Sequence, residues 1–239
     1  MDLLNLGVNF FVALFALTDP IGNIPIFAAA TATATAAQRR TIALYIALFA
    51  AGFLAFFYLS GLALLEFFGI TLPAFRIAGG VLLFMLGLDM TRSDFMNHFA
   101  DPDLGTATAP GVEPGDTRAA VRAYARRRFE RLIVPFGMPL LIGPGAISAV
   151  IIQAGDAARF GAQGTAVGLA AIAAAALAIM LIFALTGPIS RLLGGIGMAI
   201  VVRVLGLILC ALAVQFILSG IGEATQGLIL PTITNPVGH

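Results

Sequence analysis

The segment that decides the fold is Thr18-Asp19-Pro20-Ile21-Gly22-Asn23-Ile24-Pro25, a polar and helix-breaking stretch inside a long apolar run. A helix rises about 1.5 Å per residue, so residues 3–18 would cover only about 24 Å of the roughly 30 Å of hydrocarbon in a bilayer. The segment is therefore predicted to lie at membrane depth. An acid there is costly and is by default a candidate for function, which singles out Asp19.

The composition is that of a membrane protein. Of the 239 residues 60% are hydrophobic and 10% are charged, and the mean hydropathy is +1.02. The net charge of +1 gives no reason to expect a nucleic-acid partner. A single cysteine excludes a disulfide framework and a cysteine metal site, so no metal or cofactor is predicted.

Six charge-poor runs are long enough to cross a bilayer as helices. They cover residues 3–30, 42–65, 72–91, 132–155, 163–189 and 202–222. Two arginines follow the first run, seven follow the third and one follows the fifth, whereas one follows the fourth. Because arginine-rich loops stay in the cytoplasm, we predict an all-α membrane protein, a single domain over 1–239, with both termini extracytoplasmic.

The chain contains a weak internal repeat, between residues 1–92 and 132–222. Arg76 and Gly79 correspond to Arg203 and Gly206, and the breaker at 19–22 corresponds to the one at 143–146. Each half holds three runs, so the second half would enter the membrane inverted, as in many secondary transporters. The alternative is chance similarity between apolar sequences. Residues 93–131 are then a cytoplasmic loop and 223–239 a short extracytoplasmic tail.

Proline and glycine should make the first and fourth runs discontinuous helices, because proline removes a backbone donor and glycine tolerates unusual backbone angles. Backbone groups freed at membrane depth require a lined cavity. Thr18-Asp19-Pro20 reads as the cap and first turn of a second half-helix, and Gly143-Pro144-Gly145 as the start of its counterpart. Two helix N-termini facing each other would suit a carboxylate, with Asp19 receiving an ammonium group. The predicted substrate contacts are Thr18, Asp19, Pro20, Gly22, Asn23, Pro25, Gly143, Pro144, Gly145, Ala146 and Ser148.

Each of these residues also has a structural interpretation. Asp19 can be a cap whose carboxylate accepts hydrogen bonds from backbone N–H groups, and the breaks can be simple kinks. Arg76 and Arg203, at the starts of their runs, can extend to the membrane surface. The sharper hypothesis is a gate in which such an arginine pairs with Asp89 or Glu66. The full set of coupling or gating candidates is Asp19, Arg76, Asp89, Arg203 and Gln215.

The loop at 93–131 opens with a piece rich in proline, glycine and aspartate that reads as flexible. It closes with Arg118, Arg122 and Arg126, whose spacing of four predicts a basic surface helix. Anionic lipid is the expected partner of this helix, and a regulatory site is the alternative.

Several motifs resemble those of the MarC/SnatA family of six-span inner-membrane proteins, over nearly the whole chain. The first break resembles that family's motif through Asp19, Pro20, Gly22 and Pro25, and the second through Pro139, Gly143, Pro144 and Gly145. Residues 76–80 and 214–217 also agree. The resemblance implies an inverted 3+3 repeat, a bacterial inner-membrane location and, for some members, transport of glycine- or alanine-like amino acids. The basic loop is not a motif of the family.

We therefore expect a secondary transporter of small neutral amino acids, with Asp19 as a candidate for proton coupling. A passive channel, another substrate or a family member without transport activity are the alternatives. An enzyme is not expected, because Ser148 and Cys210 have no histidine near them in sequence that could act as a base. The sequence makes no prediction about the oligomeric state.

Overall fold

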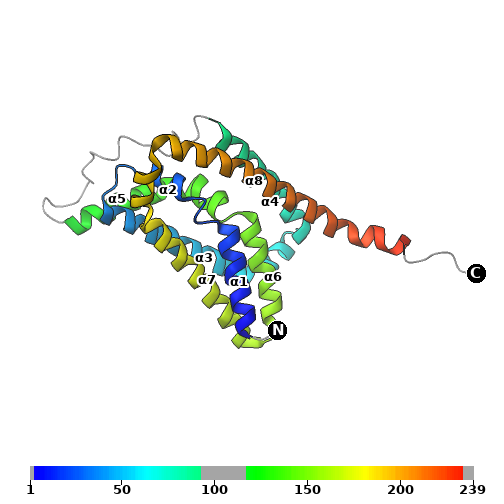
Figure 1. Cartoon of the computed structure of the whole chain (residues 1–239). Helices are drawn as coiled ribbons and strands as arrows, with labels where there is room; N and C mark the ends of the chain where they lie inside the picture. Colours follow the sequence, from blue (N-terminus) through cyan, green and yellow to red (C-terminus); the bar gives the residue numbers. More distant parts are fainter. Residues whose placement is uncertain (1–2, 93–116, 234–239) are drawn as a thin grey trace, which may run out of the picture.

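The computed structural model describes residues 3–92 and 117–233, and these residues form helices and short connections without any strand. The elements, in chain order, are α1 Leu3–Thr18, α2 Ile24–Ala30, α3 Ala36–Phe67, α4 Leu72–Thr91, α5 Thr117–Leu132, the π-helical segment η3 Ile133–Leu141, α6 Pro144–Ala158, α7 Gly161–Ala184 and α8 Thr186–Ile233. Figure 1 shows their arrangement.

Four of the described helices are long and apolar enough to cross a bilayer: α3, α4, α7 and the part of α8 from Ala199 to Thr225. The prediction of an all-helical membrane protein is confirmed. At 16 and 15 residues, α1 and α6 would each cover only about 22–24 Å, so neither can cross alone. They occupy the two runs in which helix breaks were predicted.

Local sequence explains where the long helices begin. The Thr35 hydroxyl accepts a hydrogen bond from the Gln38 N–H at 3.3 Å, and the Gln38 side chain accepts one from the Thr35 N–H at 2.8 Å, which is a capping box at the start of α3. Helix α4 follows Thr71, whose hydroxyl accepts from the Ala74 N–H, and carries Pro73 in its first turn.

Helix α8 is longer than the predicted sixth run and is interrupted at Gly194. That glycine has φ 62° and ψ 180°, a conformation that costs a residue with a side chain much more than it costs glycine. The break separates a first part that follows α7 from the spanning part at Ala199–Thr225.

Helices α4 and α8 form the most extensive helix pair and run side by side (Figure 1). Gly87 of α4 and Gly206 of α8 permit this approach. A Cβ atom placed on either one would lie less than 3 Å from the carbonyl oxygen of the other. Small residues bring helix backbones together in this way inside membranes, where packing replaces the hydrophobic driving force.

The remaining helix contacts follow a regular pattern. Helix α1 packs on α7 while α6 packs on α3, and α2 packs on α8 while α6 packs on α4. The pairs α3 with α7, α4 with α8 and α1 with α6 also pack together. Exchanging the first three predicted runs with the last three therefore converts these contacts into one another.

The basic helix predicted at the end of the loop is present as α5, but one of its faces is buried. The Arg128 side chain is 5% exposed, and its Nε donates to the carbonyl oxygen of Ala30, at the end of α2, at 2.6 Å. Phe129 packs edge-on against Tyr45 of α3. Arg118, Arg122 and Arg126 are exposed. Residues 93–116, where a flexible piece was predicted, lie outside the described residues.

Candidate functional site

The first break begins where α1 ends. The Thr18 hydroxyl donates back to the carbonyl oxygen of Leu14 at 2.8 Å, so Thr18 belongs to α1 and does not cap the next helix. Asp19 follows with φ 36°, in the left-handed region. Its Oδ1 accepts a hydrogen bond from the Gly22 N–H at 3.0 Å. The carboxylate therefore closes a turn, which is the structural role considered for it from sequence.

The second half-helix starts later than predicted. Helix α2 begins at Ile24, not at Pro20. A helix from Pro20 would carry Pro25 in its second turn, where proline lacks the required N–H and clashes with the preceding turn. Starting at Ile24 puts Pro25 in the first turn, where proline is tolerated.

Asn23 holds the first break together from within. Its side chain is buried, and its Nδ2 donates to the carbonyl oxygens of Thr18 at 3.2 Å and Asp19 at 3.0 Å. These are carbonyls at the end of α1, which no longer have helical partners. Pro20 and Pro25 are buried, whereas Asp19 is exposed at the protein surface of the break. Asn23 thus stabilises the break, and Asp19 is its accessible charge.

The second break has the predicted start. Helix α6 begins at Pro144 after an extended Gly143, and no side chain caps it. Because proline has no N–H, the N–H groups of Gly145 and Ala146 are the first donors at this end. One turn further, the Ser148 hydroxyl is 2% exposed and has no hydrogen-bond partner within the described part of the chain. A buried hydroxyl without a partner is unusual and points to a missing ligand or water.

The start of α6 opens into a cavity of about 340 Å³, which we call the Ser148 cavity. It lies between α1, α4, α6 and α8. Its lining residues are Leu17, Arg76, Gly145, Ser148, Ala149, Ile152, Gln153, Phe216 and Ser219. Five of these offer polar side chains or an exposed helix start, in a space large enough for a small metabolite.

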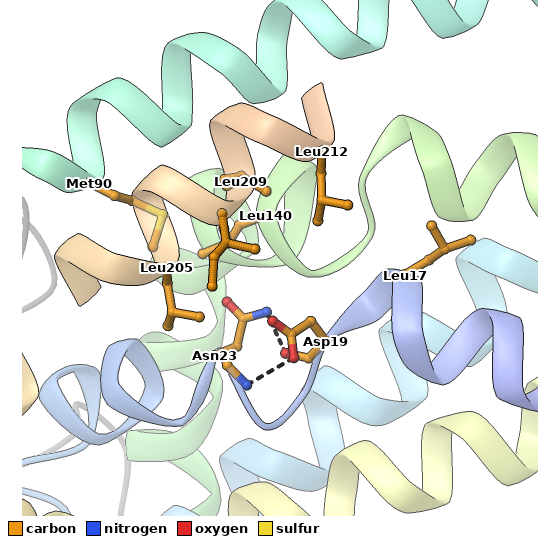
Figure 2. A pocket seen from close by; sticks show the side chains of 10 residues that line it. Leu17, Asp19, Asn23, Met90, Leu140, Leu205, Leu209 and Leu212 are labelled. Atoms are coloured by element: carbon orange, nitrogen blue, oxygen red, sulfur yellow. Dashed lines mark hydrogen bonds between the residues drawn. The ribbon is translucent and has the colours of Figure 1, made fainter. Parts of the chain in front are cut away.

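Asp19 faces a second and much smaller cavity of about 40 Å³, which we call the Asp19 cavity. Figure 2 shows Asp19 and Asn23 opposite leucines of α8. Its lining residues are Leu17, Asp19, Gly22, Asn23, Met90, Leu140, Leu205, Ile208, Leu209 and Leu212. Leu17 lines both cavities. The two breaks therefore lie close together, but in this structure they do not share one cavity.

The gating candidates are distributed differently from the prediction. Arg76 forms an ion pair with Glu223 of α8, and Asp89 pairs with Arg92 of its own helix at 3.2 Å. A gate joining Arg76 to Asp89 or Glu66 is therefore wrong. Arg203 and Gln215 are exposed and line neither of the two cavities.

The sequence pattern described as MarC family integral membrane protein matches residues 4–225, which include both breaks and both cavities. The chain belongs to the MarC family.

Curated relatives from bacteria and archaea match over almost their whole length. The UPF0056 membrane protein YhcE of Escherichia coli (strain K12) is 34% identical over 92% of this chain and 94% of its own. A UPF0056 membrane protein of Aquifex aeolicus (strain VF5) is 30% identical over 90% and 92%. One of Archaeoglobus fulgidus is 32% identical over 89% and 91%. No solved structure matches the chain.

Sequence reasoning missed several residues of the site in this MarC family protein. Leu17, Gln153, Phe216 and Ser219 line cavities but were not predicted, and Glu223 was assigned to a tail. Gln153 was detectable, because it lies one to two turns after Ser148 on the same helix. The others become visible only when α8 is packed against the breaks.

Proposed function

We propose that this MarC family protein is a secondary transporter of small neutral amino acids, which bind in the Ser148 cavity and cross by alternating access. The observation that carries the proposal is the buried and unpaired Ser148 hydroxyl beside the uncapped start of α6, in a cavity of about 340 Å³.

A carboxylate is the ligand that suits this helix start. The first N–H groups of a helix lack partners and carry partial positive charge, so they favour an anion. Gly145 and Ala146 would supply such groups, and Ser148 a hydroxyl donor. Gly145 approaches Phe216 so closely that a Cβ atom there would overlap the ring. Helix α8 thus covers the α6 start and limits the room beside the bound group.

The charges around the cavity favour a solute without net charge. Arg76 lines the cavity but is neutralised by Glu223. A zwitterion brings an ammonium group as well as a carboxylate, and Asp19 is the acid available to it on the far side of Leu17. In the proposed cycle Asp19 receives the ammonium group, or a coupling proton, after the Leu17 region has moved.

The exchangeable contacts of the two halves support an inverted repeat, residues 1–92 against 132–222, with the loop helix α5 between them. Such repeats give transporters two related states that open to opposite sides. By the distribution of arginines, the α5 end is proposed to be cytoplasmic in a bacterial inner membrane, with both termini on the other side. The exposed arginines of α5 would then face anionic lipid.

A passive channel is the alternative class, and the lining of the Asp19 cavity argues against it. A channel needs a continuous polar path, whereas Leu205, Leu209 and Leu212 surround Asp19 and Asn23. Apolar side chains at this point favour a path that is closed until the protein rearranges.

The test is counterflow of labelled glycine or alanine into liposomes that contain the purified protein, with and without a proton gradient. We expect accumulation that Ser148→Ala weakens by raising KM about tenfold, because a hydrogen bond to a charged group is lost. The matched control is Ser60→Ala on α3, whose hydroxyl already donates to the Phe56 carbonyl oxygen at 2.7 Å. Absence of counterflow for every amino acid tried would overturn the proposal.

A further inference from the structure

One face of α8 forms a continuous wall from the mouth of the Ser148 cavity to the Asp19 cavity. Residues three and four apart lie on the same face of a helix. That face is formed by Leu205, Leu209, Leu212, Phe216, Ser219 and Glu223. The first three line the Asp19 cavity, the next two line the Ser148 cavity, and the last pairs with Arg76 at the rim, where the Glu223 side chain is 41% exposed.

Opposite this wall, Leu17 is the residue common to both cavities. It lies in the last turn of α1, immediately before the break. Its neighbour Thr18 is buried and bonded to Leu14, which holds that turn helical. Figure 2 shows the Leu17 side chain on α1 beyond Asp19, at the Leu212 end of the α8 face. An apolar side chain in this position separates two regions that both contain polar groups.

The sizes of the cavities show which side of Leu17 is open. A cavity needs roughly 10–15 Å³ of this kind of volume to hold one water. The Asp19 cavity, at about 40 Å³, has room for a few waters and none for an amino acid. The Ser148 cavity, at about 340 Å³, has room for both. The structure is therefore open on the Ser148 side and closed at Leu17.

We infer that Leu17 is the barrier residue of the transport path: with Leu212 and Phe216 of α8 it closes the connection between the Ser148 cavity and Asp19. The inference rests on the proposed function for the identity of the solute. The barrier itself can be tested without any transport substrate.

The test uses accessibility of single cysteines. Cys210 is the one cysteine of the sequence, so Cys210→Ala gives a cysteine-free background. In it, Ser219→Cys reports on the Ser148 cavity and Leu209→Cys on the Asp19 cavity. A charged, membrane-impermeant methanethiosulfonate reagent is added to sealed vesicles on the side where α4 begins. We expect rapid labelling of Ser219→Cys and slow labelling of Leu209→Cys.

Adding Leu17→Ala to Leu209→Cys should raise its labelling rate from that side by about tenfold, which corresponds to about 1.4 kcal/mol less stabilisation of the closed state. Leu14→Ala is the matched control. It makes the same change one turn earlier, at a fully buried residue that lines neither cavity. If general loosening caused the labelling, Leu14→Ala would cause at least as much.

Two results would overturn the barrier: equal labelling of Leu209→Cys and Ser219→Cys with Leu17 intact, or no effect of Leu17→Ala in protein that remains monodisperse with an unchanged melting temperature. Loss of amino acid counterflow with the expected labelling pattern would remove the proposed substrate and leave the barrier in place.

Discussion

Asp19 combines a structural role and a chemical one, and its backbone shows how to separate them. It holds φ 36°, and its Oδ1 accepts from the Gly22 N–H. Asparagine tolerates the left-handed region and keeps a side-chain oxygen at the same position. We therefore expect Asp19→Asn to preserve the break and the melting temperature, and to reduce amino acid counterflow at least tenfold by removing the charge, about 1.4 kcal/mol or more.

Asp19→Ala is the matched comparison, because alanine removes the charge, the acceptor and the tolerance for this backbone angle. It should lower the melting temperature in detergent as well as transport, since a left-handed alanine costs about 1–2 kcal/mol. Wild-type transport by Asp19→Asn would mean that Asp19 acts only in the turn.

Among the helices, α6 depends on its fit against α4. A Cβ atom on Gly79 would overlap Pro144, the first residue of α6. Gly79→Ala should therefore displace the α6 start, destabilise the protein by about 1–3 kcal/mol through overpacking, and raise KM for the substrate. Thermal unfolding and counterflow measure the two effects.

Gly52→Ala on α3 is the control for Gly79→Ala, because nothing lies within 4 Å of a Cβ atom at Gly52. Alanine there should be neutral or slightly stabilising, by up to about 1 kcal/mol in a helix. Equal unfolding temperatures for the two variants would contradict the role of Gly79 in seating α6.

Helix α5 is coupled to the short half-helix α2 through Arg128, which donates to the Ala30 carbonyl oxygen. Arg128→Met keeps an apolar stem but leaves this carbonyl without the charged donor. The expected loss is about 1–3 kcal/mol, measured as a lower melting temperature in detergent. Arg126→Met is the control, since Arg126 is exposed and pairs with Glu130 on the same helix. Such surface pairs are worth less than about 1 kcal/mol.

For the molecule as a whole, sequence predicted the features that depend on local chemistry. The helical membrane class, the two breaks and the start of α6 at Pro144 follow from hydrophobic run lengths and from the backbone properties of proline and glycine. The start of α2 was predicted wrongly because Thr18-Asp19-Pro20 was read as a cap without considering Pro25, five residues after Pro20.

The division of the site into two cavities could not be predicted, because it depends on how α8 packs over the breaks. Leu17 and Phe216 look like ordinary lipid-facing or core residues in the sequence. Glu223 lies 147 positions from its partner Arg76. No local pattern connects residues so far apart, and only the tertiary arrangement identifies the rim, the cavities and the barrier between them.

The single side chain between the two cavities also has an electrical consequence. Water in the Ser148 cavity extends the outer solution toward the middle of the membrane, so the transmembrane voltage falls mainly across the thin layer beyond it. Asp19 lies just past Leu17, within that layer. A unit charge that crosses the whole voltage gains or loses about 2.3 kcal/mol per 100 mV. A proton reaching Asp19 would cross a large part of that voltage within a few ångströms.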